Sequence, residues 1–350
     1  MAELKAKNGV AICGGSWTEA WLMRRAFGQE DAGGLRGVYC DSGESAALRA
    51  GEWGCTVYGD FESAVADPDV AVLVLLDPLE DRTQRAVAAL DAGRSVLLGA
   101  PFAYDLEEAK LLHGKSNDSR GSLMCAEPWM FFEPMDRAVE IALKKNVGRP
   151  NSVRFRSVIG GAGGWDTYLN PDFRASEPDP VREPEKEVMR EFYEKLSLAY
   201  RLFGPITEIH AIPGVRDGRG TSVVTWKHEA HTTYGVLEVT FAPGLEIRSA
   251  YYPREDNTEI SGTAGIIWVT RGCSQMRREP TLHIYRGENE FSYGNLKDDW
   301  QTAYDNCALY FADCAAKRGN PELYPYRSML AVTYADAAAR SAATGERIKL

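Results

Sequence analysis

The sequence has no run of about 18 consecutive apolar residues, which is the length that a membrane-spanning helix requires. It has no basic block either: Lys and Arg total 40 against 50 Asp and Glu, so the formal net charge is −10. An acidic chain of this kind is not expected to bind nucleic acid or an anionic membrane surface. The N-terminal stretch lacks the apolar core of a signal peptide, and we expect a cytoplasmic protein.

Cysteine and metal motifs are missing as well. The seven cysteines are widely spaced, their number is odd and none forms a CxxC pair, so we expect reduced thiols. The sequence contains no P-loop, no nucleophile elbow and no cluster of zinc ligands, and we expect no metal site. The stretch from His228 to His231 resembles a metal motif, but it falls where a hairpin turn is expected, and we interpret it as a turn.

What is present is a globular composition with two successive patterns. The 350 residues are 44% hydrophobic and 26% charged, which is typical of about two soluble domains. In the first part, helical patterns alternate with short apolar strands, expected at 10–13, 35–41, 70–76, 95–98 and 122–126. Near-continuous apolar strands that alternate with helices predict a parallel sheet covered on both faces.

The second part has longer stretches in which apolar and polar residues alternate, at 152–159, 222–226, 235–241, 246–251, 265–270 and 282–285. This period of two predicts antiparallel strands with one covered face. Helices are expected at 185–203, 300–318 and 326–343. The sequence therefore predicts an α/β protein with a parallel-sheet domain over 1–128 and a second domain with an open, mostly antiparallel sheet over 129–350. The last helix is a candidate to pack back near the first domain.

A glycine-rich turn follows the first predicted strand. The dinucleotide fingerprint G-x-G-x-x-G uses two glycines for a tight turn and close phosphate approach, and a third for helix packing. Here Gly14 keeps the first position, Ser16 replaces the second and Glu19 replaces the third. A carboxylate in the first helical turn competes with a bound pyrophosphate. We therefore expect dinucleotide binding to be weakened or lost.

Asp41 ends the second predicted strand. It stands at the position from which a carboxylate grips the ribose diol of NAD. If a dinucleotide binds, Asp41 favours NAD over NADP, because a 2′-phosphate would meet like charge. The alternative is that Asp41, Ser42 and Gly43 only form an exit from the strand into a turn. Both interpretations stay open at this point.

Several stretches taken together resemble the glucose-fructose oxidoreductase/inositol dehydrogenase family (Gfo/Idh/MocA). They are GDFESAVADPDVAVLVLLDP at 59–78, AALDAGRSVLLGAP at 88–101, LFGPITEI at 202–209 and AAARSAATG at 337–345. The resemblance spans nearly the whole chain. It implies a Rossmann-type nucleotide-binding domain, a C-terminal α/β domain, NAD or NADP as cofactor and a sugar-like small molecule as substrate. It also implies that the C-terminal sheets pair into a homodimer or a higher homo-oligomer.

The residues that carry the family's chemistry are largely altered. Aligned on Pro101, Gly99 and Ala100 stand in place of the family's Glu and Lys, and the family's His near the nicotinamide falls on Arg82. A methyl group cannot move a proton. With these changes, the resemblance places the cofactor on Gly14, Gly15, Ser16, Trp17, Asp41, Pro78, Arg82, Ala100 and Pro101.

The helix expected at 185–203 carries a polar stripe. Arg190 and Glu194 are four residues apart, and by themselves they predict an ion pair on a solvated face. The resemblance places the family's acid–base pair at these two positions, which implies Glu194 as an acid or base and Arg190 as a clamp for an anionic substrate group. Tyr193 on the same helix and Glu127 after the last parallel strand are further catalytic candidates.

Three functions remain open from the sequence. The first is an oxidoreductase with a rebuilt active site that acts on a small polar, sugar-like or anionic molecule. The second is an enzyme that uses the same fold for lyase or isomerase chemistry, and the third is a catalytically silent binding protein. The Gly- and Pro-rich stretch 160–183 is interpreted as a loop, with a lid over the substrate as an alternative.

Overall fold

The computed structural model describes residues 9–29, 31–160, 184–212, 222–229, 233–317, 321 and 325–350. These residues form two compact units. Unit 1 comprises the described residues up to Pro128 together with those of Tyr304–Val332, and unit 2 comprises the others. Residues 161–183 lie outside the described part, and so does the lid interpretation that rests on them.

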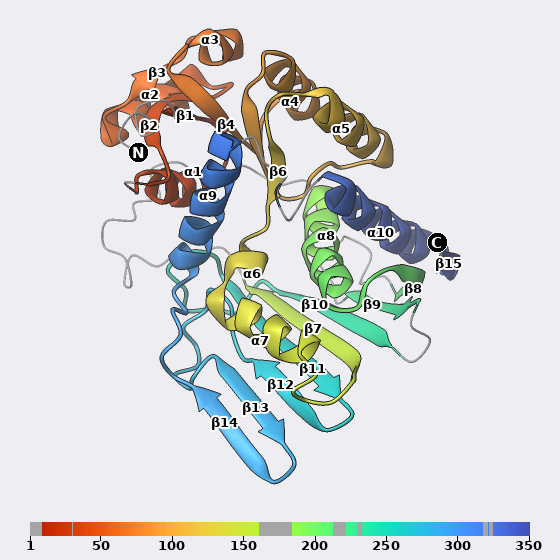
Figure 1. Cartoon of the computed structure of the whole chain (residues 1–350). Helices are drawn as coiled ribbons and strands as arrows, with labels where there is room; N and C mark the ends of the chain where they lie inside the picture. The colour runs from red at the N-terminus through yellow and green to blue at the C-terminus, as the bar shows by residue number, and fades with distance from the viewer. Residues whose placement is uncertain are drawn as a thin grey trace. The chain divides into compact units, whose positions relative to one another are not determined.

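Unit 1 is built on a parallel sheet of six strands in the order β3-β2-β1-β4-β5-β6 (Figure 1). The strands are β1 (Gly9–Gly14), β2 (Gly34–Tyr39), β3 (Thr56–Val57), β4 (Val70–Leu76), β5 (Ser95–Gly99) and β6 (Leu123–Ala126). Every neighbouring pair is parallel, which confirms the predicted sheet. The strand order reverses between β1 and β4, and open α/β sheets bind ligands at the carboxyl ends of strands at such a switch point.

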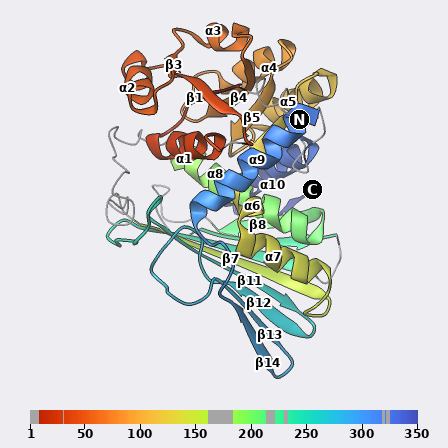
Figure 2. The ribbon, with the colours of Figure 1, turned by 60° about the vertical axis from the view of Figure 1, so that its left-hand side comes forward.

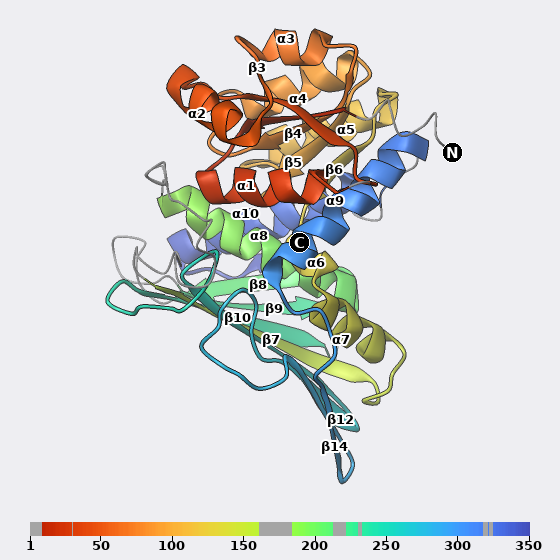
Figure 3. The same ribbon diagram turned by 90° about the vertical axis from the view of Figure 1, so that its left-hand side faces the viewer.

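Helices cover both faces of this sheet. They are α1 (Trp17–Phe27), α2 (Gly43–Trp53), α3 (Phe61–Ala66), α4 (Arg82–Asp91) and α5 (Leu106–Asp118). Figure 3 shows α1 on one face and α3, α4 and α5 on the other. Four of the helices begin at a side-chain cap that accepts a hydrogen bond from the N–H three residues on, made by Ser16, Ser42, Asp60 and Asp105. Because both faces are covered, β5 is buried along its whole length.

Unit 2 is built on a sheet of nine strands in the order β14-β13-β12-β11-β7-β10-β9-β8-β15. The strands are β7 (Pro150–Gly160), β8 (Ile206–Ile212), β9 (Ser222–His228), β10 (Tyr234–Ala242), β11 (Arg254–Gly262), β12 (Gly265–Val269), β13 (Leu282–Arg286), β14 (Asn289–Tyr293) and β15 (Ile348–Lys349). The pair β7–β10 is parallel and the remaining pairs are antiparallel, so the predicted mostly antiparallel sheet is confirmed.

The second sheet differs from the prediction in five strands. The strand expected at 246–251 is absent, and this segment makes only an isolated bridge between Ser249 and Ser274. The Ser249 hydroxyl accepts the N–H groups of Tyr251 and Tyr252 and so turns the chain out of a strand path. The sequence pattern also missed β8, β11, β14 and β15, and β11 is mostly polar.

One face of the sheet is covered. The helices of unit 2 are α6 (Pro128–Phe131), α7 (Glu133–Leu143), α8 (Pro184–Phe203), the start of α9 (Trp300–Lys317) and the end of α10 (Pro325–Thr344). Figures 2 and 3 show α7 and α8 on the same side of the sheet. Trp226, Leu237 and Ile267 face this side and are buried. On the open side, Trp268 is partly exposed and donates a hydrogen bond to Glu259.

Candidate functional site

The turn between β1 and α1 requires glycine at two positions. Gly14 has φ +72° and Gly15 has φ +91°, a conformation that side chains rarely adopt. A Cβ at Gly14 would lie 2.5 Å from the carbonyl oxygen of Leu76 in β4. Ser16 then caps α1 by accepting the N–H of Glu19 at 3.3 Å. The turn is therefore fully formed although Ser16 replaces the second glycine of the fingerprint.

Arg49 of α2 holds this turn by its carbonyl groups. Its buried guanidinium donates hydrogen bonds of 2.8 Å to the carbonyl oxygen of Gly14 and of 2.8 Å to that of Gly15. It also lies 6.0 Å from the ring of Trp17, the first residue of α1. Because C=O and N–H point in opposite directions in a trans peptide, the clamp directs the Ser16 N–H away from Arg49. Sequence analysis missed Arg49, since nothing in its local pattern marks it.

Glu19 is buried, and its carboxylate reaches the end of β5. A Cβ at Gly99 would lie 3.2 Å from Glu19 Oε1, so the Glu19 side chain fills the space that a larger residue at position 99 would need. Burial alone would lower the pKa of Arg82, but Asp77 and other nearby negative groups, Glu19 among them, raise it. The charge of Glu19 thus lies close to a buried cation, which weakens its expected effect on a bound phosphate.

Arg82 joins the loops that follow β4 and β5. Its guanidinium lies 2.7 Å from Asp77 Oδ2 and donates to the carbonyl oxygens of Gly99 at 2.8 Å and Pro101 at 2.7 Å. Ala100 between them is buried. The structure therefore places Arg82, Ala100 and Pro101 together at the end of β5, where Arg82 organises the loop backbone.

Asp41 is engaged on both oxygens. Oδ1 lies 2.7 Å from Arg85 Nη1 and accepts the Tyr39 hydroxyl at 2.9 Å, and Oδ2 accepts the Glu80 N–H at 2.7 Å. Burial alone would raise the pKa of Asp41, but these hydrogen bonds and the Arg85 charge lower it. The cap of α2 is made by Ser42 instead. Asp41 is therefore a charged group in a local network, and it is more than a strand-to-turn exit.

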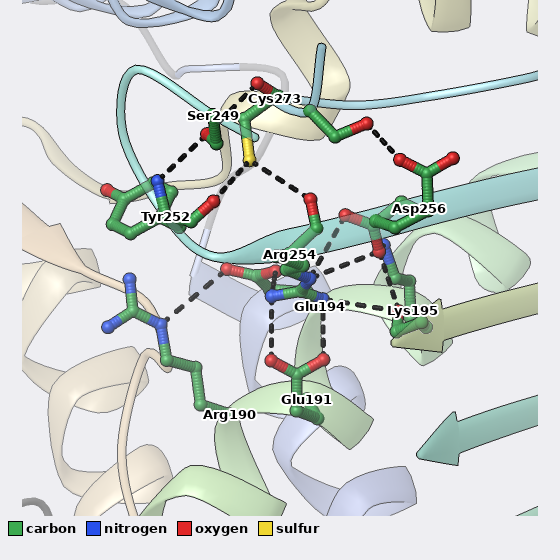
Figure 4. A network of polar contacts seen from close by, with 12 residues as sticks. Arg190, Glu191, Glu194, Lys195, Ser249, Tyr252, Arg254, Asp256 and Cys273 are labelled. Carbon is green, nitrogen blue, oxygen red and sulfur yellow. Dashed lines mark hydrogen bonds and ion pairs between the residues drawn. The ribbon is translucent and has the colours of Figure 1, made fainter. Parts of the chain in front are cut away.

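In unit 2, α8 and β11 bring together five charged side chains, which we call the α8–β11 cluster: Glu191, Glu194, Lys195, Arg254 and Asp256 (Figure 4). Four of them are buried, and the Arg254 side chain is 14% exposed. Arg254 is at its centre. It donates two hydrogen bonds to Glu191, one of them 2.7 Å long, and its Nε lies 3.0 Å from Asp256. Burial alone would lower the pKa of Arg254, but the surrounding carboxylates raise it.

Lys195 occupies the other side of the cluster. Its Nζ lies 3.2 Å from Asp256 Oδ1 and 3.7 Å from the ring centroid of Trp129. Burial lowers the pKa of Lys195, while the charge of Asp256 opposes this shift. Ser157 donates a hydrogen bond of 2.6 Å to Asp256. Such closely packed ionisable groups are more common at functional sites than elsewhere, although they also occur in structural networks.

Burial raises the pKa of Glu191 to about 7, against the opposing charge of Arg254. The folded state therefore binds a proton at pH values where the unfolded carboxyl has lost it. We expect Glu191 to contribute stability that is fully present below about pH 4.5 and is lost as the pH rises through about 7, with about 2 kcal/mol lost between pH 5 and 7. Chemical denaturation at several pH values measures this slope.

Glu191→Gln should reduce this pH dependence whatever it does to the absolute stability. The matched control is Glu238→Gln on β10, where the carboxylate is 43% exposed and should leave the slope unchanged. An identical slope in wild type and Glu191→Gln would show that Glu191 titrates normally.

The structure brings Arg190 and Glu194 together, with Arg190 Nε 3.8 Å from Glu194 Oε1. Their side chains are only 14% and 8% exposed, so the pair is not on a solvated face. Glu194 also lies 3.9 Å from Arg254, and this links the pair to the α8–β11 cluster. Tyr193 on the same helix is fully buried.

Glu127 follows β6 in unit 1 and is buried. Burial and the charge of Glu127 raise the pKa of Cys307, which places α9 beside the end of β6. All seven cysteines are free. His228 ends β9, and its ring hydrogen-bonds Gly204 O at 2.9 Å and accepts the Trp226 Nε1–H at 3.0 Å. Residues 230–232, on which the turn expected at 228–231 depends, lie outside the described part.

Within the described ranges, no group of His, Cys, Asp and Glu side chains is placed to hold a metal ion. In the same part of the chain, no helix combines the length and apolar character needed to cross a membrane.

Solved structures with the same fold cover nearly all of the chain. An oxidoreductase from Agrobacterium radiobacter, in complex with NAD+, L-tartaric acid and magnesium, is 15% identical with a TM-score of 0.77, over 98% of both chains. Levoglucosan dehydrogenase with NADH and levoglucosan is 16% identical with a TM-score of 0.76, over 98% of this chain and 99% of the other. GenD2 from gentamicin A biosynthesis, in complex with NAD, is 20% identical with a TM-score of 0.75, over 98% and 96%. The fold is that of these oxidoreductases.

Matches to curated sequences are shorter. A 1-carboxy-3-chloro-3,4-dihydroxycyclohexa-1,5-diene dehydrogenase from Comamonas testosteroni is 32% identical over 99 residues, which are 28% of this chain and 24% of that protein. The dehydrogenase aclE from Aspergillus oryzae is 28% identical over 109 residues, which are 31% and 30% of the two chains. The chain thus matches less than a third of the length of these relatives. No protein-family model matches the sequence.

Proposed function

We propose that the chain is a nicotinamide-dependent oxidoreductase of the Gfo/Idh/MocA type that acts on a small polar, sugar-like or anionic molecule. The observation that carries the proposal is the glycine turn of unit 1, where Gly14 and Gly15 lie at the β1/β4 switch point and lead into the capped start of α1. The full-length likeness to NAD-bound oxidoreductases and the dehydrogenase names of the curated relatives support it.

The residues of the turn fit a dinucleotide. The first N–H groups of a helix have no partner within the helix, and here Arg49 fixes the turn that precedes them. The N–H groups of Ser16, Trp17 and Thr18 would hold the pyrophosphate. Asp41 would lie toward the ribose, and Pro78, Arg82, Ala100 and Pro101 toward the nicotinamide, which supplies the hydride acceptor when bound.

Oxidation of a hydroxyl group also releases a proton, and Glu194 is our candidate to take it. The Glu194 carboxylate lies 3.8 Å from Arg190 and 3.9 Å from Arg254. One of its oxygens would accept the hydroxyl proton, and Arg190 would bind an anionic group of the substrate. Tyr193 and Glu127 are the alternative acid–base residues. Levoglucosan, L-sorbose and L-tartaric acid, the compounds named with the solved structures, form a first substrate panel.

The variant Ser16→Asp tests the cofactor site. Aspartate retains the cap of α1 but adds a negative charge where the pyrophosphate would bind, so we expect at least a tenfold weaker affinity for NADH and NADPH. Calorimetric titration of wild type and Ser16→Asp with each dinucleotide measures this loss of affinity. The control Thr56→Asp adds the same charge at an exposed residue of β3 and should bind like wild type. Equal loss in the two variants, or none in either, would argue against a phosphate site at this turn.

We also propose a homodimer or higher homo-oligomer through the open face of the unit 2 sheet. The partly exposed residues Val223, Val236, Ile266 and Trp268 face this side, between charged neighbours. Monomers rarely leave large apolar patches exposed. Light scattering at micromolar concentration should give at least twice the mass of the chain, and a monodisperse monomer would contradict the proposal.

A further inference from the structure

Arg85 of α4 lies at the end of β2, where the adenosine ribose of a dinucleotide would bind. Its guanidinium lies 2.7 Å from Asp41 Oδ1, 5.0 Å from the ring centroid of Tyr39 and 5.6 Å from that of Phe61. Its side chain is 18% exposed and that of Asp41 is 29% exposed. These contacts therefore fix the Arg85 guanidinium at a place that solvent still reaches.

Asp41 has little capacity left for a ribose. A carboxylate offers about four acceptor positions. Arg85 and Tyr39 occupy two on Oδ1, and the Glu80 N–H occupies one on Oδ2. Binding both hydroxyls of a ribose diol needs two acceptors, so Asp41 would have to release one of its present donors. Asp41 is also less able to repel a 2′-phosphate and so to favour NAD over NADP, because Arg85 balances the charge of Asp41.

Arg85 has the chemistry that a 2′-phosphate requires. A guanidinium has five N–H donors. Within the described residues, Arg85 donates one to Asp41 and also makes a side-chain hydrogen bond with Tyr39, which leaves further donors for a phosphate. Its plane can bind phosphate through two parallel hydrogen bonds, and its position over Tyr39 limits the freedom it must lose to do so.

We propose that Arg85 determines the cofactor specificity of this chain: it withdraws Asp41 from the ribose and binds the 2′-phosphate, so that NADPH is preferred to NADH. The inference rests on the proposed function, because it presupposes that unit 1 binds a dinucleotide. It replaces the preference for NAD that Asp41 suggests from the sequence alone.

The test compares the dissociation constants of NADPH and NADH by calorimetry in wild type, Arg85→Met and Arg36→Met. Arg36 is the matched control, because it pairs with Asp69 on the same unit, with both side chains more than half exposed. We expect wild type to bind NADPH more tightly than NADH. Arg85→Met should weaken NADPH binding at least tenfold and leave NADH binding unchanged or tighter, whereas Arg36→Met should change neither.

The fragments 2′,5′-ADP and ADP separate the 2′-phosphate from the nicotinamide and should show the same shift. Arg85→Lys keeps the charge without the paired hydrogen bonds and should lie between wild type and Arg85→Met, and circular dichroism checks that each variant folds. A wild type that prefers NADH, or an Arg85→Met variant that weakens both dinucleotides equally, overturns the inference while the proposed function stands. Absence of binding for every dinucleotide and fragment overturns both.

Discussion

Arg254→Met is expected to lower the free energy of unfolding by about 3–5 kcal/mol at pH 7.5, because removing one partner of a buried ion pair leaves its charges uncompensated. Arg254 contacts Glu191, Glu194 and Asp256, and Lys195 would be the remaining cation of the α8–β11 cluster. Chemical denaturation followed by circular dichroism measures the loss. The loss should shrink toward pH 5, where Glu191 is protonated.

Arg156→Met is the matched control for this prediction. Arg156 lies on β7 with a side chain that is 51% exposed, and it is 3.6 Å from Glu238 on the neighbouring strand. Exposed pairs of this kind contribute about 0–1 kcal/mol. Equal effects of the two substitutions would mean that the α8–β11 cluster is not an electrostatically coupled unit.

Glu194→Gln is expected to reduce turnover about a hundredfold or more in variant protein that circular dichroism shows to be folded. Glutamine keeps the shape of the side chain but cannot accept the hydroxyl proton. Steady-state kinetics on the compound of the substrate panel that wild type oxidises best measures the loss. Glu140→Gln on α7 is the control, because Glu140 also pairs with a cation four residues away but is 38% exposed.

Arg190→Met separates binding from proton transfer at the same helix. If Arg190 clamps an anionic group, this substitution should mainly raise the KM and leave kcat close to wild type.

Turnover of Glu194→Gln within about twofold of wild type, a difference of under 0.5 kcal/mol, would end the assignment of Glu194. The search for the base would then move to Tyr193 and Glu127.

The fold could be predicted because its signals are local. Apolar strands that alternate with helices indicate the parallel sheet, and the period of two after residue 150 indicates the second sheet. β11 escaped this reasoning because its inward positions include Asp256 and Thr258, which are buried although polar. β11 is also the strand that contributes Arg254 and Asp256 to the α8–β11 cluster.

The candidate site could be predicted only in part, because most of its contacts join residues that are far apart in the sequence. Arg190 and Glu194 are four residues apart, so their pairing follows from helix geometry. Arg254 reaches Glu191 from 63 residues away in the chain, and Arg49 reaches Gly14 from 35 residues away. Such contacts depend on tertiary packing, which spacing within one segment does not reveal. β2 ends at Tyr39, so Asp41 follows the strand instead of ending it, and its partner Arg85 comes from α4.

Unit 1 is proposed to bind a nicotinamide dinucleotide, and a calorimetric titration of the wild-type protein with NADPH and NADH measures this binding. Ser16 and Glu19 in place of glycines should each cost on the order of 1 kcal/mol, or about a fivefold loss of affinity. We therefore predict saturable binding with a dissociation constant in the micromolar range. Submicromolar binding would show that the two substitutions do not weaken the site. No heat of binding for either dinucleotide up to millimolar concentration would contradict the proposed oxidoreductase.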